Sequence, residues 1–242
     1  MDQWNNVNNG RRIFITRHIT MKIRKYGLEL KEVEREDLEL IRQYRNTDII
    51  KKKMIHRQQI TREQQLEWYK EIRSVKHYYF LIYKDDSAIG LINGKNIDFL
   101  NKTSEGGIFV WNEDRNYEIS ITASIILNDW NFFINAFEKN YAQVLKSNKQ
   151  AIAYNEFMGY KIANRTHEND QVIWMEQTRE DYAIYRKKIE LLKFEDFNIS
   201  EPLTENDIFF DADEEAYARS IVELIPASQQ EIYNRILKRA FP

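Results

Sequence analysis

The chain has 242 residues, of which 43% are hydrophobic and 31% are charged, and its formal net charge is −2. This balance argues against a dedicated nucleic-acid-binding protein, because neutralising phosphates requires a basic face. The absence of cysteine excludes disulfides, thiolate metal sites and a cysteine nucleophile, and the four histidines have no metal-pair spacing. With a polar start and no apolar run of 18 residues, we expect a cytoplasmic protein without a membrane-spanning helix or a metal site.

Hydrophobic periodicity predicts a mixture of strands and helices from residue 28 onward. Apolar–polar alternation and aromatic or β-branched runs mark the strands, and apolar residues three and four positions apart mark the helices. The predicted strands are 28–33, 78–83, 88–92, 105–112, 141–145 and 171–176. The predicted helices are 37–44, one that begins at the Thr61–Gln64 capping box, a long buried helix through Ile119 to Phe137, and 149–158. This order predicts an α/β (α+β) domain with a mixed central sheet flanked by helices.

The chain is predicted to divide into three parts. Residues 1–26 form an N-terminal extension, residues 27–177 form the α/β domain, and residues 178–242 form a C-terminal helical extension. Within the last part, two amphipathic helices are predicted at 213–225 and 228–239. From the acidic composition after Phe194 we expect this tail to lie outside the core, where its amphipathic helices suit a protein partner.

Three stretches together resemble the GNAT superfamily of N-acetyltransferases, and within it the enzymes that act on amino sugars and sugar nucleotides. They are Arg45-Asn46 with Ile60-Thr61 and Glu67-Trp68-Tyr69, then Glu105 to Phe109 leading into the long helix, then Asn148 to Ile152 ending in Met158-Gly159-Tyr160. The resemblance implies that the strands ending near Asn112 and Leu145 run parallel and splay apart. It also implies that acetyl-CoA lies in the gap and that the amine of a small molecule attacks its thioester.

The resemblance also implies which residues form the site. The residues expected to contact acetyl-CoA are Phe109, Val110, Arg115, Asn116, Tyr117, Glu118, Ile119, Ser120 and Asn148. Glu105 is expected as the general base, Tyr154 as the general acid, and His56 and Arg57 as residues that line the acceptor site. Each has a simpler interpretation as well: Glu105 as an ordinary strand-end carboxylate, and Asn148 as a helix cap alone.

Glu118 leaves two functions open. The phosphate-binding loop of the family reads Q/R-x-x-G-x-G/A, and Glu118 stands where a glycine is expected. A carboxylate about 4 Å from a phosphate, at an effective dielectric constant of about 20, costs about 4 kcal/mol. The first hypothesis is an acyl-CoA-dependent N-acyltransferase that acts on a small-molecule amine such as an amino-sugar nucleotide. The second is a GNAT-like module without catalytic activity that serves binding or scaffolding.

Overall fold

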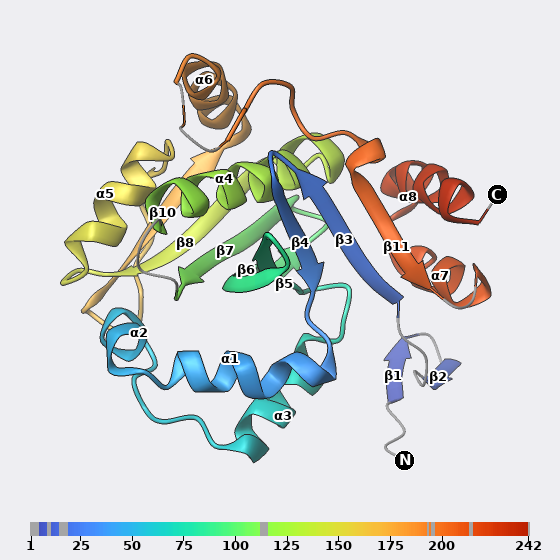
Figure 1. Ribbon diagram of the computed structural model, residues 1–242, viewed down its shortest axis with the longest axis horizontal. Coiled ribbons are helices and arrows are strands. Elements are labelled where there is room, and N and C mark those ends of the chain that lie inside the picture. The colour runs from blue at the N-terminus through green and yellow to red at the C-terminus, as the bar shows by residue number, and fades with distance from the viewer. Residues whose placement is uncertain are drawn as a thin grey trace.

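The computed structural model describes residues 5–8, 11–14, 19–111, 116–192, 194, 197–212 and 215–241. One nine-stranded sheet dominates it, in the order β11-β3-β4-β5-β6-β7-β8-β10-β9 (Figure 1). Its strands are β3 (Ile19–Lys25), β4 (Leu28–Glu32), β5 (Tyr78–Lys84), β6 (Ser87–Asp98), β7 (Thr103–Val110), β8 (Lys139–Leu145), β9 (Lys161–Ile162), β10 (Val172–Thr178) and β11 (Ile208–Ala212). A separate pair consists of β1 (Asn5–Asn8) and β2 (Arg11–Phe14).

Helices cover both faces of the sheet. They are α1 (Leu38–Arg45), α2 (Asp48–Lys53), α3 (Arg62–Ile72), α4 (Asn116–Asp129), α5 (Lys149–Phe157), α6 (Arg179–Glu190), α7 (Glu215–Val222) and α8 (Ala227–Ala240). Side chains alternate across a strand, so a strand covered on both faces is apolar throughout. In β5, Phe80 and Ile82 join the core on the α4 face while Leu81 joins the core under α1 and α3, and all three are 0% exposed. None of the described helices combines the length and apolarity needed to span a bilayer.

The predicted hairpin and helix caps are present. Asp85 and Asp86 take positive φ between β5 and β6, as a tight hairpin turn requires. At the start of α3, Thr61 Oγ1 accepts from Gln64 N–H (3.2 Å), and Gln64 Oε1 accepts from Thr61 N–H (2.9 Å). Gly159 follows α5 with φ +89°, the left-handed conformation that glycine adopts at helix exits. The mixed α/β architecture expected from the element order is therefore confirmed.

The long helix ends earlier than its apolar periodicity predicts. α4 stops at Asp129, and the chain continues through a π-helical turn, Trp130–Ile134. Asn135 N–H donates to Trp130 C=O (2.9 Å), which is the wide i to i+5 pattern. Phe137 is buried but lies beyond this turn. Periodicity continues past the end of the helix because Trp130, Phe132 and Ile134 of the turn stay buried, although Phe133 is exposed.

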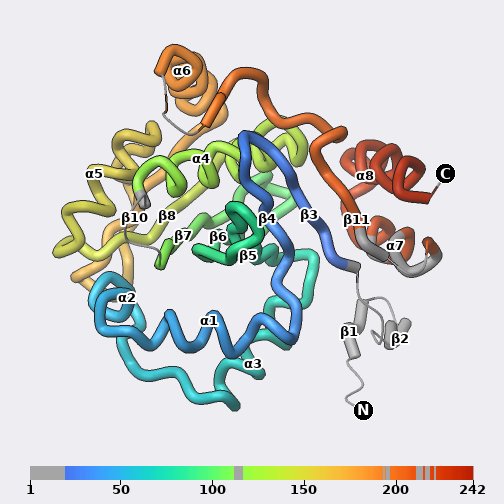
Figure 2. The backbone as a smooth tube through the Cα atoms, viewed as in Figure 1, coloured from blue at the N-terminus to red at the C-terminus, as the bar shows by residue number. Residues whose placement is uncertain are grey.

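The ends of the chain belong to the core more closely than composition predicts. β3 pairs with β4, and β11 pairs with β3, so the expected boundary at residue 27 falls inside the sheet. β11 lies beside β3, and α8 packs against β11 (Figure 2). Tyr233 on α8 packs edge-on against Trp130 (5.7 Å between ring centroids) and donates to Asn135 Oδ1 (2.6 Å). The amphipathic tail therefore covers the domain itself, which corrects the expectation that residues 195–242 lie outside the core.

Candidate active site

The parallel strands β7 and β8 part soon after they meet. They pair only where Thr103–Glu105 faces Lys139–Tyr141. Beyond this point β7 pairs with β6 alone, up to Val110, and β8 pairs with β10 alone, up to Leu145. A gap therefore opens at Gly106 and Ala142, and the facing backbone edges of both strands have no strand partner there among the described residues. This is the splayed parallel pair that the family resemblance implies.

A buried polar cluster fixes the point at which the two strands part. Ser104 and Asn140 are directly opposite in the register, and Ser104 Oγ donates to Asn140 Oδ1 (2.7 Å). Asn140 Nδ2 then donates to Asn128 Oδ1 on α4 (3.2 Å). All three residues are buried. Because buried polar groups need their partners, this cluster ties both strands to α4 and fixes where the gap begins.

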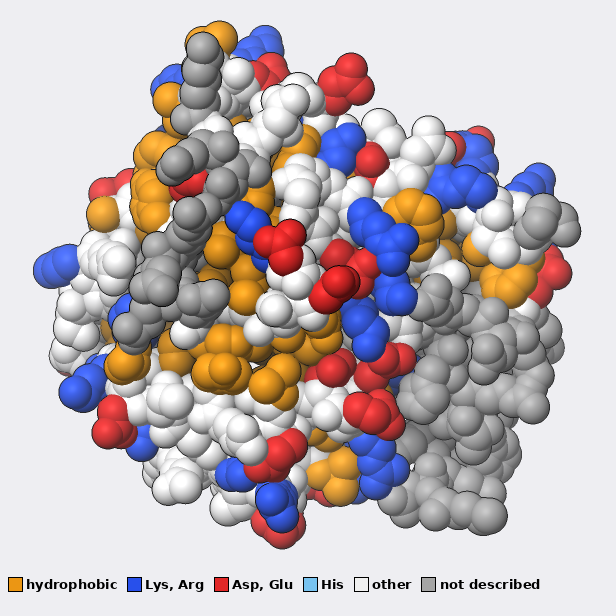
Figure 3. Space-filling view, in the orientation of Figure 1, with side chains coloured by type: hydrophobic (Ala, Val, Ile, Leu, Met, Phe, Trp, Pro, Cys, Tyr) orange, Lys and Arg blue, Asp and Glu red, His pale blue; other side chains and the backbone are white. Residues whose placement is uncertain are grey.

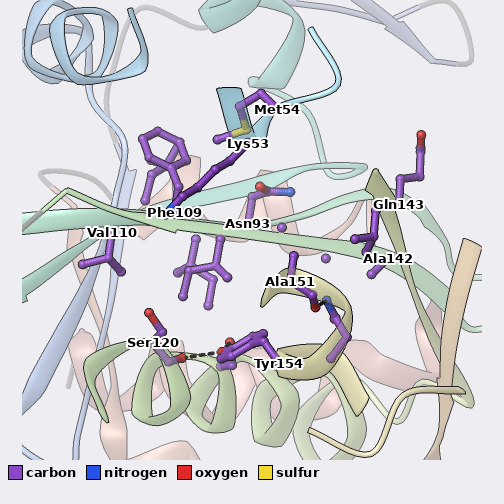
Figure 4. A pocket seen from close by; sticks show the side chains of 18 of the residues that line it. Lys53, Met54, Asn93, Phe109, Val110, Ser120, Ala142, Gln143, Ala151 and Tyr154 are labelled. Carbon is purple, nitrogen blue, oxygen red and sulfur yellow. Dashed lines mark hydrogen bonds between the residues drawn. The ribbon is translucent and has the colours of Figure 1, made fainter. Parts of the chain in front are cut away.

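A cleft of about 1500 Å³ occupies the gap. Hydrophobic side chains gather between α1 and the α4–α5 pair on the face that Figure 3 shows. The close view in Figure 4 separates the cleft into two sides across β7. On the α4 side lie Val110, Ser120, Ala151 and Tyr154, and on the α1 side lie Lys53, Met54, Asn93, Phe109 and Gln143.

The N-terminus of α4 borders the α4 side. α4 begins at Asn116, and Tyr117, Glu118 and Ser120 line the cleft. Ile119 points instead into the core, at 3% exposure, so only its backbone is available to a ligand. A helix N-terminus offers free N–H groups and a positive dipole end, which favour an anion. Arg115 lies outside the described residues.

Tyr154 bonds to α4. Its hydroxyl lies 2.8 Å from both Ser120 O and Ser124 Oγ, and one of these contacts is drawn in Figure 4. Burial raises the pKa of the phenol well above its usual value, so the group keeps its proton at neutral pH. Asn148, the next predicted residue, caps α5 by accepting from Ala151 N–H (3.1 Å) and also donates to Lys53 O (3.4 Å).

Glu105 lies at the start of the gap and is 4% exposed. Its Oε1 receives Lys95 Nζ (2.8 Å) and Gln143 Nε2 (2.8 Å), and its Oε2 receives Asn96 Nδ2 (3.0 Å). An ionised carboxylate has about four acceptor positions. Three donors therefore hold the carboxylate in place and leave room for one more hydrogen bond from the cleft.

Of the two residues expected to line the acceptor site, His56 and Arg57, only His56 lines the cleft. Its carbonyl accepts from Arg45 Nη2 (2.7 Å). Arg57 is exposed, does not line the cleft, and donates to Met54 O (3.4 Å). Exposed loop positions such as these have no periodicity from which a direction can be predicted.

Several other polar lining residues have no role in the sequence interpretation. Asn93, Lys95 and Gln143 are among them. β6 runs to Asp98, beyond the predicted strand end at residue 92, so the first two lie on an unpredicted part of a strand. Asn93 and Lys95 lie opposite Gly107 and Glu105 of β7. Extending the predicted pairing of these two strands beyond residue 92 would have placed both residues beside the site. Among the described residues, no group of histidine and acidic side chains could hold a metal ion.

Comparison with known proteins agrees with this geometry. The family described as acetyltransferase (GNAT) domain matches residues 30–173, which is more than half of the chain. Similar solved structures include spermidine N-acetyltransferase from Vibrio cholerae in complex with CoA and spermine (22% identity, TM-score 0.57, 65% of this chain and 98% of that chain). Another is the dodecameric intermediate-state structure of spermidine N-acetyltransferase from the same organism (20%, 0.53, 64% and 96%). No curated protein matches the chain. The chain belongs to the GNAT acetyltransferase family.

Proposed function

We propose that this protein transfers an acetyl group from acetyl-CoA to the amine of a small molecule. The observation that carries the proposal is the gap between β7 and β8, which opens into one cleft shared by the α4 side and the α1 side. Family membership supports acetyltransferase chemistry. In this proposal acetyl-CoA lies on the α4 side of the cleft and the acceptor amine lies on the α1 side. The two substrates meet at the gap between β7 and β8.

Most of the residues along the gap and at the N-terminus of α4 fit acetyl-CoA. The unpaired edges of β7 and β8 offer N–H and C=O groups to an extended amide-containing arm, as a sheet edge does to an added strand. Gly106 presents no side chain at the gap, and a Cβ there would be in ordinary van der Waals contact, 3.9 Å from its nearest neighbours. The N-terminus of α4 suits phosphate groups. Glu118 is the exception, since its carboxylate lines the cleft in the first turn of that helix.

Acetyl-CoA, when bound, supplies the thioester carbonyl that an amine attacks. Glu105 is placed to take a proton from the acceptor ammonium, directly or through a water molecule, because one acceptor position of its carboxylate remains free. Tyr154 holds a proton on the α4 side, where Ser120 and Ser124 orient its hydroxyl. An amino-sugar nucleotide is the acceptor that the three family-like stretches favour.

The test follows free CoA released from acetyl-CoA in the presence of an amine panel that includes amino sugars and their nucleotides. We expect amine-dependent release that Glu105→Gln slows by about 100- to 10,000-fold, the usual contribution of a general base. Glu176→Gln is the matched control, because this partly exposed carboxylate on β10 pairs with Lys139 and does not line the cleft. Equal rates for Glu105→Gln and wild type would contradict the assigned base.

The second candidate function is a GNAT-like module that binds a partner without catalysis. The placement of Glu118 in the cleft favours it, because a carboxylate at a helix N-terminus can occupy the place of a phosphate. A folded protein that binds no acetyl-CoA, but regains binding in Glu118→Gly, would support this second function over the first.

A further inference from the structure

Two buried donors in the cleft have no hydrogen-bond partner among the described residues. They are Arg45 Nη1 and Asn93 Nδ2, and both residues line the cleft. A buried donor that makes no hydrogen bond is costly, so native proteins satisfy nearly all of them. Two such donors in one cleft indicate a ligand that supplies the missing acceptors.

Arg45 is held in place without a counter-charge. It ends α1, and its Nη2 donates to the backbone carbonyl of His56 (2.7 Å). No carboxylate among the described residues pairs with it, whereas Arg42, one turn earlier on the same helix, pairs with Glu39 (2.7 Å). Burial lowers the pKa of Arg45, but an arginine stays charged throughout the physiological range. Its positive charge is therefore available to the cleft.

Asn93 is fixed by its packing against β7. It lies directly opposite Gly107 in the β6–β7 register. A Cβ at Gly107 would come within 2.9 Å of Asn93 Oδ1, so only glycine leaves room for the amide. Figure 4 shows Asn93 on the α1 side of β7. Its free N–H group is thus presented on the same side as Arg45, which comes from α1 itself.

Apart from Glu105, the remaining charged residues on this side are also positive. Lys53 lines the cleft, and Lys95 is paired with Glu105, which is the only acidic lining residue on the α1 side within the described part of the chain. A protonated polyamine brings only cations and N–H donors, and neither unsatisfied group could bond to it. A phosphate or carboxylate offers oxygen acceptors in the planar arrangement that a guanidinium binds with two parallel bonds.

We propose that the acceptor amine carries a phosphate or carboxylate group bound by Arg45, and a further oxygen acceptor bound by Asn93. The inference rests on the proposed function, because it places the anion on the acceptor side of an acetyl-transfer cleft. It makes Arg45 the residue that selects anionic amines over polyamines.

The test measures equilibrium binding by calorimetry, with the protein saturated with CoA. Two probe pairs differ only in the anion: glucosamine 6-phosphate against glucosamine, and lysine against cadaverine. Spermidine is the fifth probe. We expect an anionic member to bind about ten- to a hundredfold more tightly than its partner, the range for a hydrogen bond to a charged group. The phosphate and carboxylate pairs show which anion the site takes.

Variants distinguish the contribution of Arg45 to the anion preference from that of the protein's other positive charges. Arg45→Gln should abolish the preference for the anion, and Arg45→Lys should keep part of it as a point charge. Arg62→Gln is the matched control, because Arg62 is 75% exposed and does not line the cleft. Asn93→Leu should weaken glucosamine 6-phosphate and glucosamine alike, because both carry sugar oxygens that can accept from Asn93. Circular dichroism confirms that each variant is folded.

Several results would overturn the proposal. They are equal binding of both members in each pair, a preference that survives Arg45→Gln, or tightest binding of spermidine. The proposed function is tested separately by the CoA titration that precedes the probes. If CoA does not bind but an anionic probe binds through Arg45, the anion site is supported and the acetyltransferase function is contradicted.

Discussion

Asp129 joins the tail to the α/β domain, and its replacement tests that connection. It ends α4 at 0% exposure and accepts from Arg186 Nε (3.3 Å), Leu203 N–H (2.9 Å) and the hydroxyls of Tyr26 and Tyr182. Burial raises the pKa of Asp129, while Arg186 and the other donors oppose that rise. One carboxylate thus binds β3–β4, α6 and the segment that leads to β11.

The size of the effect follows from these contacts. Removing one partner of a buried ion pair costs about 3–5 kcal/mol, because the other charge stays buried. Arg186 is 3% exposed at its side chain, although Glu190 also pairs with it (3.1 Å) and offsets part of the loss. We therefore expect Asp129→Ala to lower the free energy of unfolding by about 3 kcal/mol, a large share of the 5–15 kcal/mol typical of a domain.

Urea unfolding followed by tryptophan fluorescence measures this loss. The double variant Asp129→Leu with Arg186→Met is the matched control, because it removes both charges and fills the space with apolar atoms. It should be less destabilised than the sum of the two single variants. A loss below about 1 kcal/mol in Asp129→Ala, or simple additivity in the double variant, would refute the reasoning.

Three further predictions follow from the structure. Deleting residues 195–242 should abolish cooperative unfolding, because it uncovers Trp130 and the β3 edge; a cooperative urea transition for the remainder would show that the tail is dispensable. The free energy of unfolding should fall steeply above about pH 10, where unfolded phenols ionise but buried ones keep their protons, by about 1.4 kcal/mol per pH unit for each phenol. Burial raises the pKa of Tyr79 to about 12 and raises that of Tyr78, Tyr160 and Tyr233 further, so a flat profile of urea midpoint against pH would contradict their burial. Glu118→Gly should strengthen acetyl-CoA binding in calorimetry by at least about tenfold, and Glu118→Gln by less, since removing one like charge near a phosphate relieves up to about 4 kcal/mol; unchanged affinity would mean that Glu118 faces away from the phosphates.

Much of the fold was predictable from turns and helix caps, because each of these depends only on residues close to it in the sequence. The capping box at Thr61, the Asp85–Asp86 turn and the glycine after α5 are each set within a few residues. The parallel pairing of β7 and β8 also follows from local order, because a long crossover helix lies between them. The family resemblance added the splay, which periodicity does not predict.

Long-range partners were not predictable in this way. The amphipathic pattern of α8 is the same whether it covers this domain or a partner, and only the contact with Trp130 decides between them.

The site was predictable where it follows the strands. Glu105, which the resemblance implies as the base, lies at the end of the β7–β8 pairing, where the gap starts. Arg45 and Asn93 were not assigned a role, because the role proposed for them rests on one buried donor of each that has no hydrogen-bond partner among the described residues. Such an absence is visible only once the elements around the cleft are placed in space.

Hydrogen exchange in the presence and absence of acetyl-CoA tests the central claim most directly. The β7 and β8 edges that face the gap have no strand partner, so their outward amides should exchange quickly in the free protein. The account predicts that acetyl-CoA slows exchange within residues 106–110 and 142–145 and at the start of α4. Binding that protects other segments and leaves these unchanged would contradict the claim that the gap holds acetyl-CoA.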